Sequence, residues 1–182
     1  MPERGDGAVI RRETAADHAA IGQVVAAAFG SEAEAQLVEA IRASDAYVPE
    51  LALVAELEGS VVGHVMVSFV GLDDLAGNVR TIASLSPLAV APDRQGQGIG
   101  SALVAAVTAE ADRRGEPLVV LEGDPRYYGR LGFEPSAPQG ITITLPSWAP
   151  AEAAQLMRLG SYDPAIRGHV IYPPAFDGVV DH

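Results

Sequence analysis

The chain has 182 residues, of which 48% are hydrophobic and 20% are charged, a composition typical of one globular domain with a sizeable core. Its formal net charge of −12 argues against nucleic acid and anionic membranes as partners. The absence of cysteine excludes disulfides, a thiol nucleophile and cysteine-based metal sites.

The acidity is compatible with a cationic acceptor, such as a protonated amine, but solubility is the simpler account of it. The N-terminal segment has no apolar core of the signal-peptide kind. No apolar run is long enough to span a membrane. We therefore expect a cytoplasmic enzyme.

Short apolar segments separated by capping residues predict the elements of the first half of the chain. Thr14 with Asp17 is expected to cap one helix, and Ser31 with Glu34 to form a capping box for the next. The apolar face of the first helix is expected to extend to Phe29. The predicted elements are a strand at 9–12, these two helices, strands at 51–57 and 61–70 that form a hairpin, and a loop at 71–81.

The second half begins with an apolar strand at 85–91, a glycine-rich turn and an amphipathic helix from about Gly98 to Arg114. Arg113, Arg114 and Gly115 provide a stop signal for that helix, because cations suit its negative end and glycine suits the left-handed position after it. No repeat, linker or second domain is apparent. The remaining predicted elements are a strand at 118–121, a short helix after Pro125, a strand at 141–145, a short helix at 151–159 and a last strand at 169–172.

The glycine-rich turn, residues 93–101, has the geometry of a phosphate cradle. Glycines let backbone N–H groups approach an anion, and the first N–H groups of a helix point outward with partial positive charge. The P-loop pattern fails because no lysine follows the glycines. The dinucleotide pattern GxGxxG fails because it would need glycine at Ser101 or Leu103. A plain strand-to-helix turn is the remaining alternative to a cradle.

Two motifs in this region resemble the GNAT superfamily of N-acetyltransferases. Gln95-x-x-Gly98-x-Gly100 is similar to the acetyl-CoA signature [Q/R]-x-x-G-x-[G/A] of that family. Downstream, Gly123-Asp124-Pro125-Arg126-Tyr127-Tyr128-Gly129-Arg130 leads to a Gly-Phe step and is similar to the second GNAT motif. Together with Tyr172-Pro173-Pro174-Ala175-Phe176, it resembles one bacterial subgroup of predicted acetyltransferases.

The resemblance implies an α/β fold, with a mixed twisted sheet of about six to seven strands and helices on both faces. A single domain would span 1–182, with core motifs in 84–135 and a C-terminal part, 136–182, that completes the sheet and the acceptor side. Ser86-Pro87 fits this fold, because proline in a central strand indicates a bulge, and the family's strand splays there to admit the pantetheine arm. A misassigned loop is the alternative.

The resemblance also implies that acetyl-CoA is the cosubstrate. The glycine turn would hold its pyrophosphate, and a backbone N–H near Val90 would polarise the thioester carbonyl. Asp124 would fix the turn into the short helix or touch the pantetheine. The residues expected to contact acetyl-CoA are Leu88, Ala89, Val90, Gln95, Gly96, Gln97, Gly98, Ile99, Gly100, Ser101, Asp124 and Tyr128.

Tyr128 aligns with the family tyrosine that protonates the departing thiolate. A phenol with a pKa of about 10 stays protonated at neutral pH and can donate, although a structural core tyrosine is the alternative. The strand before the glycine turn carries no general base. Glu122 is the best carboxylate candidate; water relayed through Ser84 or Ser86 is equally compatible, and a merely solvated Glu122 is the simpler account.

The histidines at 18, 64, 169 and 182 have no metal-ligand spacing, so no metal is expected. His64 is expected to pack or face solvent, and His169 either to approach an acceptor site or only to precede the last strand. Trp148 and Met157 are expected to pack in the hydrophobic interior.

The resemblance thus implies acetyl transfer from acetyl-CoA to a primary amine within a ternary complex, by an enzyme compatible with a homodimer. Three alternatives stay open. The chain could be a non-catalytic acyl-CoA sensor, an acyltransferase for a longer acyl group, or an interaction protein whose acidic surface recruits a basic partner.

Overall fold

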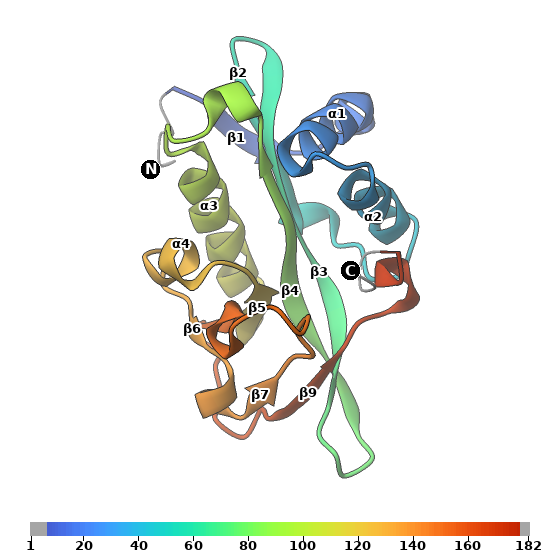
Figure 1. The fold of residues 1–182 in the computed structure, drawn as a ribbon, viewed down its shortest axis with the longest axis vertical. Coiled ribbons are helices and arrows are strands. Elements are labelled where there is room, and N and C mark those ends of the chain that lie inside the picture. Colours follow the sequence, from blue (N-terminus) through green and yellow to red (C-terminus); the bar gives the residue numbers. More distant parts are fainter. Residues whose placement is uncertain (1–6, 179–182) are drawn as a thin grey trace.

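A mixed β-sheet with helices on both faces makes up the fold (Figure 1). The computed structural model describes residues 7–178. Within that range seven strands follow the order β1-β2-β3-β4-β5-β8-β6, while β9 pairs with β3 and with β7. The strands are Val9–Arg12 (β1), Ala52–Leu57 (β2), Ser60–Asp73 (β3), Val79–Val90 (β4), Leu118–Glu122 (β5), Glu134–Pro135 (β6), Ile141–Thr142 (β7), Ala154–Arg158 (β8) and Gly168–Ile171 (β9). The helices are His18–Phe29 (α1), Ala33–Arg42 (α2), Ile99–Arg113 (α3) and Pro125–Gly129 (α4).

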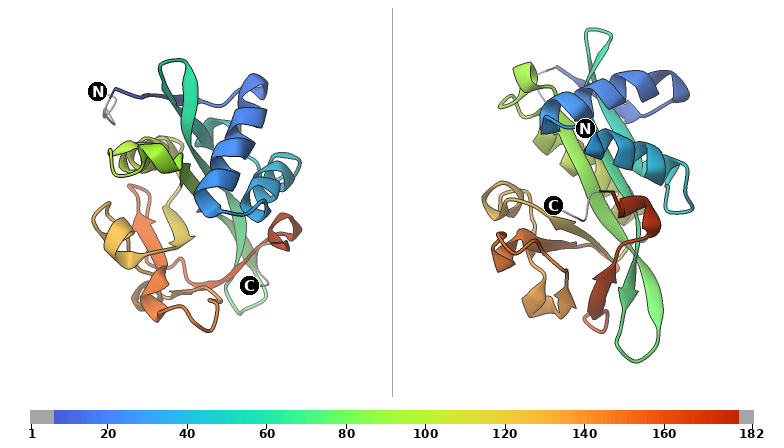
Figure 2. Two further views of the ribbon diagram at one scale, coloured as in Figure 1. Left: turned by 45° about the horizontal axis from the view of Figure 1, so that its top comes forward. Right: turned by 45° about the vertical axis from the view of Figure 1, so that its right-hand side comes forward.

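Alternate residues of the central strands belong to two separate cores, because successive side chains of a strand point to opposite faces. Val54 and Met66 lie in the core with α1 and α2, whereas Val65 and Val67 lie in the core with α3. Figure 2 shows α1 and α2 together on one side of the sheet and α3 on the other. The predicted architecture, with helices on both faces, is confirmed.

Strand β4 bulges at the predicted position. Leu85 and Leu88 of β4 pair with β3 residues that are only two apart, so Met66 lies opposite both Ser86 and Pro87. A bulge accommodates proline because the ring removes a donor from the ladder.

Strands β4 and β5 also separate, as expected. They are parallel and pair only at Ala83 and Ser84 of β4. From Leu85 to Val90, therefore, β4 has no partner on the β5 side. This leaves backbone donors and acceptors along one edge of β4 available to a ligand.

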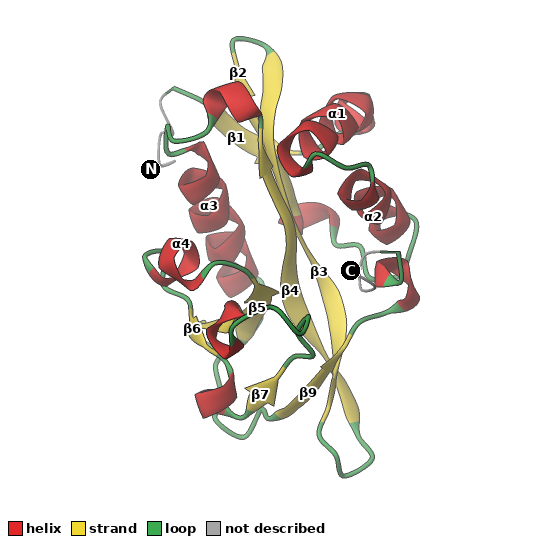
Figure 3. Ribbon diagram, in the orientation of Figure 1, coloured by secondary structure: helices red, strands yellow, loops and turns green. Residues whose placement is uncertain are grey.

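The prediction of a loop over residues 71–81 is wrong. Strand β3 extends to Asp73 and β4 begins at Val79, so the turn comprises only residues 74–78 (Figure 3). Glycine, aspartate and asparagine suggested a loop, but β9 pairs with residues 71–73 of β3 and satisfies their backbone groups.

The prediction of a short helix over residues 151–159 is also wrong. Residues 154–158 form β8, which pairs with all of β5 and with β6. Alanine, glutamine, leucine and methionine favour helices, but pairing on both edges and the burial of Ala154, Gln155 and Leu156 override that preference. Only Ile141–Thr142 of the strand expected at 141–145 is formed.

Two local predictions about the first helices need correction. Phe29 is 44% exposed, because α1 ends there and Gly30 turns the chain away in a left-handed conformation. The capping box of Ser31 and Glu34 does not form: the Ser31 hydroxyl accepts the N–H of Ala33, and Glu34 makes no reciprocal bond. By contrast, Asp17 accepts the backbone N–H of Thr14 as predicted, although a short 3₁₀ turn precedes α1.

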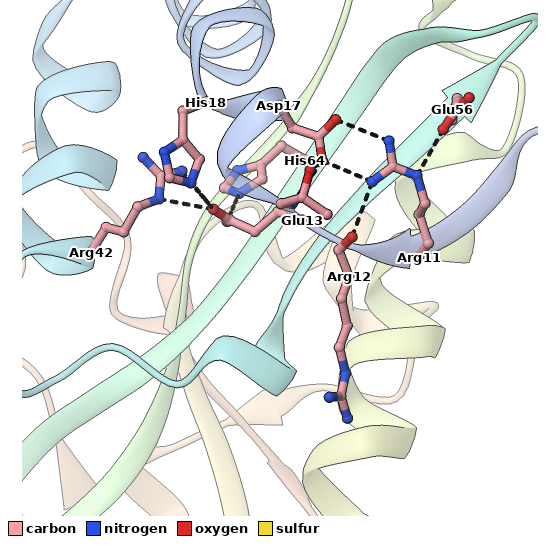
Figure 4. Close-up of polar contacts among 9 residues, drawn as sticks. Arg11, Arg12, Glu13, Asp17, His18, Arg42, Glu56 and His64 are labelled. Atoms are coloured by element: carbon pink, nitrogen blue, oxygen red, sulfur yellow. Dashed lines mark hydrogen bonds and ion pairs between the residues drawn. The ribbon is translucent and has the colours of Figure 1, made fainter.

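A buried ion cluster fastens α1 and α2 to the sheet (Figure 4). Glu13 follows β1, and its side chain is 1% exposed. Its carboxylate lies 3.1 Å from Nε2 of His64 on β3, accepts from Nε of Arg42 in α2 at 2.8 Å, and lies 3.2 Å from Nε2 of His18 in α1. Burial would raise the pKa of Glu13, but His64 and Arg42 outweigh it and lower that pKa. Helices α1 and α2, which this cluster holds against the sheet, contribute residues to the site described below.

Removing the charge of Glu13 should destabilise the fold. Glu13→Gln removes the buried counter-charge of Arg42, which then keeps only the exposed Glu39, and we expect unfolding to become easier by about 3 kcal/mol. The melting temperature should fall by about 6–12 °C for a chain of this size. Glu39→Gln is the matched control, since Glu39 also pairs with Arg42 but its side chain is 62% exposed, so a small change is expected. Equal shifts in the two variants would contradict a special role for the buried cluster.

Stability should also decline with acidification because of His64, which is fully buried. Burial lowers its pKa despite the neighbouring Glu13, and its Nδ1 atom has no hydrogen-bond partner among the described residues. Folded protein therefore keeps this ring neutral, while the unfolded chain binds a proton below about pH 6.5. The free energy of unfolding should be highest above that pH and fall by up to about 1.4 kcal/mol per pH unit below it.

Urea unfolding at a series of pH values checks this expectation. Between about pH 7.5 and about pH 5, His64→Gln should show a shallower dependence than the wild type, whereas His169→Gln should keep the wild-type dependence. An unchanged slope in His64→Gln would assign the acid sensitivity to another group, first of all Glu13, whose lowered pKa also makes stability fall on acidification.

Candidate functional site

The turn after β4 and the start of α3 form a concave surface, the cradle (residues 94–101). Gly96 and Gly98 have positive φ angles of +77° and +82°, which glycine adopts at little cost. Helix α3 then begins at Ile99, so its unpaired N–H groups face the turn. The cradle borders a cavity of about 470 Å³, which also touches Leu88 and Val90 on the free edge of β4.

Two contacts fix the shape of the cradle. The side-chain amide of Gln95 donates to the carbonyl of Val90 at 3.0 Å, which ties the turn to the end of the strand. At Gly100, an added Cβ would lie 2.5 Å from the hydroxyl oxygen of Tyr127, so a larger residue there would displace the Tyr127 side chain. Tyr127, expected only to pack, thus also lines the cavity.

Arg94 is a cradle residue that the sequence reasoning missed. Its side chain lines the same cavity, and no acidic residue does. In a chain with a formal charge of −12, this arginine supplies a local cation beside the helix terminus. Its place directly before Gln95 was the available signal.

Tyr128 lies beyond the free edge of β4, on helix α4. Asp124 caps that helix by accepting a backbone N–H at 2.9 Å, as predicted. The Tyr128 ring packs edge-on against Tyr127 and Phe133, with ring centroids 4.9 and 5.7 Å apart. Burial, with a smaller contribution from Tyr127, raises the pKa of Tyr128 above its ordinary value. The hydroxyl therefore stays protonated at neutral pH.

Glu122, at the end of β5, lines a cavity together with Tyr128. The hydroxyl of Tyr172 donates to Oε2 of Glu122 at 2.5 Å. Partial burial of the Glu122 carboxylate raises its pKa, and the Tyr172 hydrogen bond only partly opposes this. A carboxylate with a raised pKa is a better proton acceptor at physiological pH. Glu122 nevertheless belongs to the exposed residues, so the alternative of a solvated Glu122 stays open; Tyr172, 50 residues away in the chain, was not predicted as its partner.

Two further cavities adjoin each other on the side of α2 and the C-terminal segment. We call the one beside Tyr128 the inner cavity and the one beside Tyr172 the outer cavity. Both touch Leu37, Leu85, Ser86 and Glu122, and the inner cavity shares Leu88 with the cradle. The cradle cavity, the inner cavity and the outer cavity therefore form a continuous path from the cradle, along the free edge of β4, to the C-terminal segment.

The remaining residues expected to contact acetyl-CoA divide into those that line a cavity and those that do not. Gly96, Gly98, Ile99, Gly100 and Ser101 line the cradle cavity together with Gln95. The side chain of Ala89 is 2% exposed and faces the core with α1 and α2, which leaves only its backbone for a ligand. Gln97 and Asp124 line none of the three cavities.

Residues outside the motifs also depart from expectation. Both ring nitrogens of His169 are engaged, by the hydroxyls of Thr142 and Thr144 at 2.7 and 2.9 Å. Trp148, expected to pack, is 78% exposed, whereas Met157 packs against the core with α3. His182 lies outside the described residues.

Two kinds of structural feature are absent from residues 7–178. No helix in that range combines the length and the apolar character needed to cross a bilayer. No group of three or more histidine, cysteine, aspartate or glutamate side chains in it has the arrangement of a metal site.

The chain is similar to known proteins over the region that contains the cradle. A family model described as "Acetyltransferase (GNAT) domain" matches residues 49–135, which include the cradle, Glu122 and Tyr128. The uncharacterized N-acetyltransferase YjhQ of Escherichia coli K12 is 32% identical over 159 residues, covering 85% of this chain and 86% of that protein. YhbS of the same strain, also an uncharacterized N-acetyltransferase, is 33% identical over 161 residues, covering 88% and 91%.

Two solved structures are similar over most of the chain. The crystal structure of E. coli YhbS in complex with CoA has a TM-score of 0.80 and 32% identity, covering 93% of this chain and 92% of that one. A GNAT family acetyltransferase from Brucella melitensis in complex with acetyl-CoA has a TM-score of 0.73 and 34% identity, covering 93% and 98%.

Proposed function

This chain belongs to the GNAT superfamily of N-acetyltransferases, and on that premise we propose that it transfers the acetyl group of acetyl-CoA directly to a primary amine. The observation that carries the proposal is the continuous path from the cradle, past Tyr128 and Glu122, to the outer cavity. One end of that path suits a pyrophosphate, and its middle brings a proton donor and a proton acceptor together.

The residues of the cradle fit acetyl-CoA. A Cβ at Gly96 or Gly98 would meet no protein atom within 4 Å, so the backbone there is open to a ligand. The N–H groups at the start of α3 and the guanidinium of Arg94 would bind the pyrophosphate. The unpaired edge of β4 would hold the pantetheine arm through its backbone, and the relatives crystallised with CoA and acetyl-CoA support this assignment.

Acetyl-CoA supplies an activated acyl group in the form of a thioester. Backbone N–H near Val90 would polarise its carbonyl oxygen. Glu122 would accept a proton as the amine nitrogen forms its bond to the carbonyl carbon. Tyr128 would donate a proton to sulfur as the carbon–sulfur bond breaks. Ser84 and Ser86 both line the outer cavity with Glu122, so a water between them and the amine is a second route for the same proton.

Calorimetric titration with acetyl-CoA, followed by amine-dependent thiol release, tests the proposal. We expect binding to require the pyrophosphate, so S-acetylpantetheine, which lacks it, should bind much more weakly. Absence of acetyl-CoA binding at millimolar ligand would overturn the proposal. Binding without turnover of any amine would favour the acyl-CoA sensor, and faster turnover of longer thioesters would favour another acyltransferase.

A cytoplasmic location, a single domain over 1–182 and a homodimer stay predictions of the same proposal. Fractionation of the source cells tests the cytoplasmic location, and light scattering of the purified chain tests the homodimer.

A further inference from the structure

We infer that the acceptor is a small primary amine without a carboxylate group, held between Glu34 and Glu122. The inference rests on the proposed function, because it names the class of molecule that would fill the inner and outer cavities. Glu34 would act as a specificity-determining residue for that amine.

The charges that line the two cavities support this class. Glu34 and Glu122 line the inner cavity, and Glu122 also lines the outer one. Among residues 7–178, no arginine or histidine lines either cavity, and the chain contains no lysine. An acceptor with a carboxylate would thus meet two negative charges and no cation, whereas an ammonium group would meet two counter-charges.

Glu34 has a specific need for a donor. It lies in the first turn of α2, where the helix terminus favours negative charge. Its Oε2 atom is buried and has no hydrogen-bond partner among the described residues. Leaving a buried carboxylate oxygen unpaired is costly, and an ammonium group in the inner cavity would offset this cost by placing a positive charge beside the carboxylate.

The remaining walls limit the size and character of the acceptor. Leu37, Leu85, Leu145 and Phe176 give the outer cavity an apolar surface, with hydroxyls from Ser84 and Thr144. The outer and inner cavities have volumes of about 180 and 330 Å³. Small, partly apolar cavities of this kind suit a compact amine with one alkyl or aryl group.

Rates of thiol release from acetyl-CoA with matched acceptors test the inference. The pairs are phenethylamine with phenylalanine, isoamylamine with leucine, and cadaverine with lysine, which differ only in the α-carboxylate. We expect each amine to have a kcat/KM at least about 30-fold higher than its amino acid, since two unpaired like charges disfavour the latter. The absence of lysine in the chain removes acetylation of its own lysine side chains as a background.

Glu34→Gln keeps the size of the side chain and removes its charge. We expect KM for the amines to rise about 10-fold with a smaller change in kcat, and the preference over amino acids to shrink by a similar factor. Glu32→Gln is the matched control, because Glu32 begins the same helix, is exposed and lines neither cavity. It should leave both parameters unchanged.

Equal or better turnover of the amino acids would overturn the inference while leaving acetyl transfer intact. Turnover confined to lysine-containing peptides, or an unchanged KM in Glu34→Gln, would overturn it in the same way. Failure of every amine, amino acid and peptide despite acetyl-CoA binding would instead remove the proposed function and this inference with it.

Discussion

Replacing Tyr128 by phenylalanine is expected to lower kcat for acetyl transfer by about 10²- to 10³-fold, the usual contribution of a positioned general acid. Without the hydroxyl, sulfur would have to leave as an unprotonated thiolate or take its proton from water. The edge-on contacts with Tyr127 and Phe133 involve the ring, which phenylalanine retains. Affinity for acetyl-CoA, measured by calorimetry, should therefore change little.

Tyr127→Phe is the control for this prediction. Tyr127 is the neighbouring phenol, but it lines the cradle cavity and not the inner cavity. Its loss should alter acetyl-CoA affinity more than kcat. If Tyr128→Phe turned over at the wild-type rate, Tyr128 would be only a structural side chain and another donor would have to be sought.

Replacing Gly98 by aspartate is expected to weaken acetyl-CoA binding by about 10³-fold. The new carboxylate would lie beside the pyrophosphate, and a like-charge contact at about 4 Å costs about 4 kcal/mol near a protein surface. The position has a φ of +82°, which also disfavours any residue with a Cβ. No protein atom lies within 4 Å of an added Cβ, so a clash within the protein would not explain the loss.

Gly98→Ala separates the two causes. Alanine adds the Cβ at the same positive φ but no charge, and we expect less than about 10-fold loss of affinity. Calorimetric titration measures both variants, and circular dichroism checks their fold. Unchanged affinity in Gly98→Asp would mean that the pyrophosphate binds elsewhere.

The sequence predicted the strand, turn and helix that form the cradle well, because their signals are local. The strand, the glycine turn and the helix lie consecutively in the chain, and the positive φ angles of Gly96 and Gly98 follow from their residue type. The bulge at Ser86-Pro87 could be predicted for the same reason, since proline lacks a donor whatever surrounds it.

The acceptor side could not be predicted, because its contacts join distant segments. Nothing near Tyr172 in the chain indicates that its hydroxyl meets Glu122, and Glu34 was interpreted as a capping residue. Strand β8 was missed for a related reason: its residues favour a helix, and only pairing with β5 makes them a strand. The burial of His64 likewise depends on Glu13, which follows β1, and on Arg42 of α2.

Different segments of the chain line the cradle cavity and the inner and outer cavities, so these can vary separately among related proteins. The family model covers residues 49–135 and so includes the cradle, whereas Glu34, Tyr172 and Phe176 lie outside it. Substitutions in the flanking segments can therefore reshape the proposed acceptor end while the cradle stays unchanged. Exchanging those segments between related chains should transfer acceptor preference from one chain to the other, with the central segment held constant.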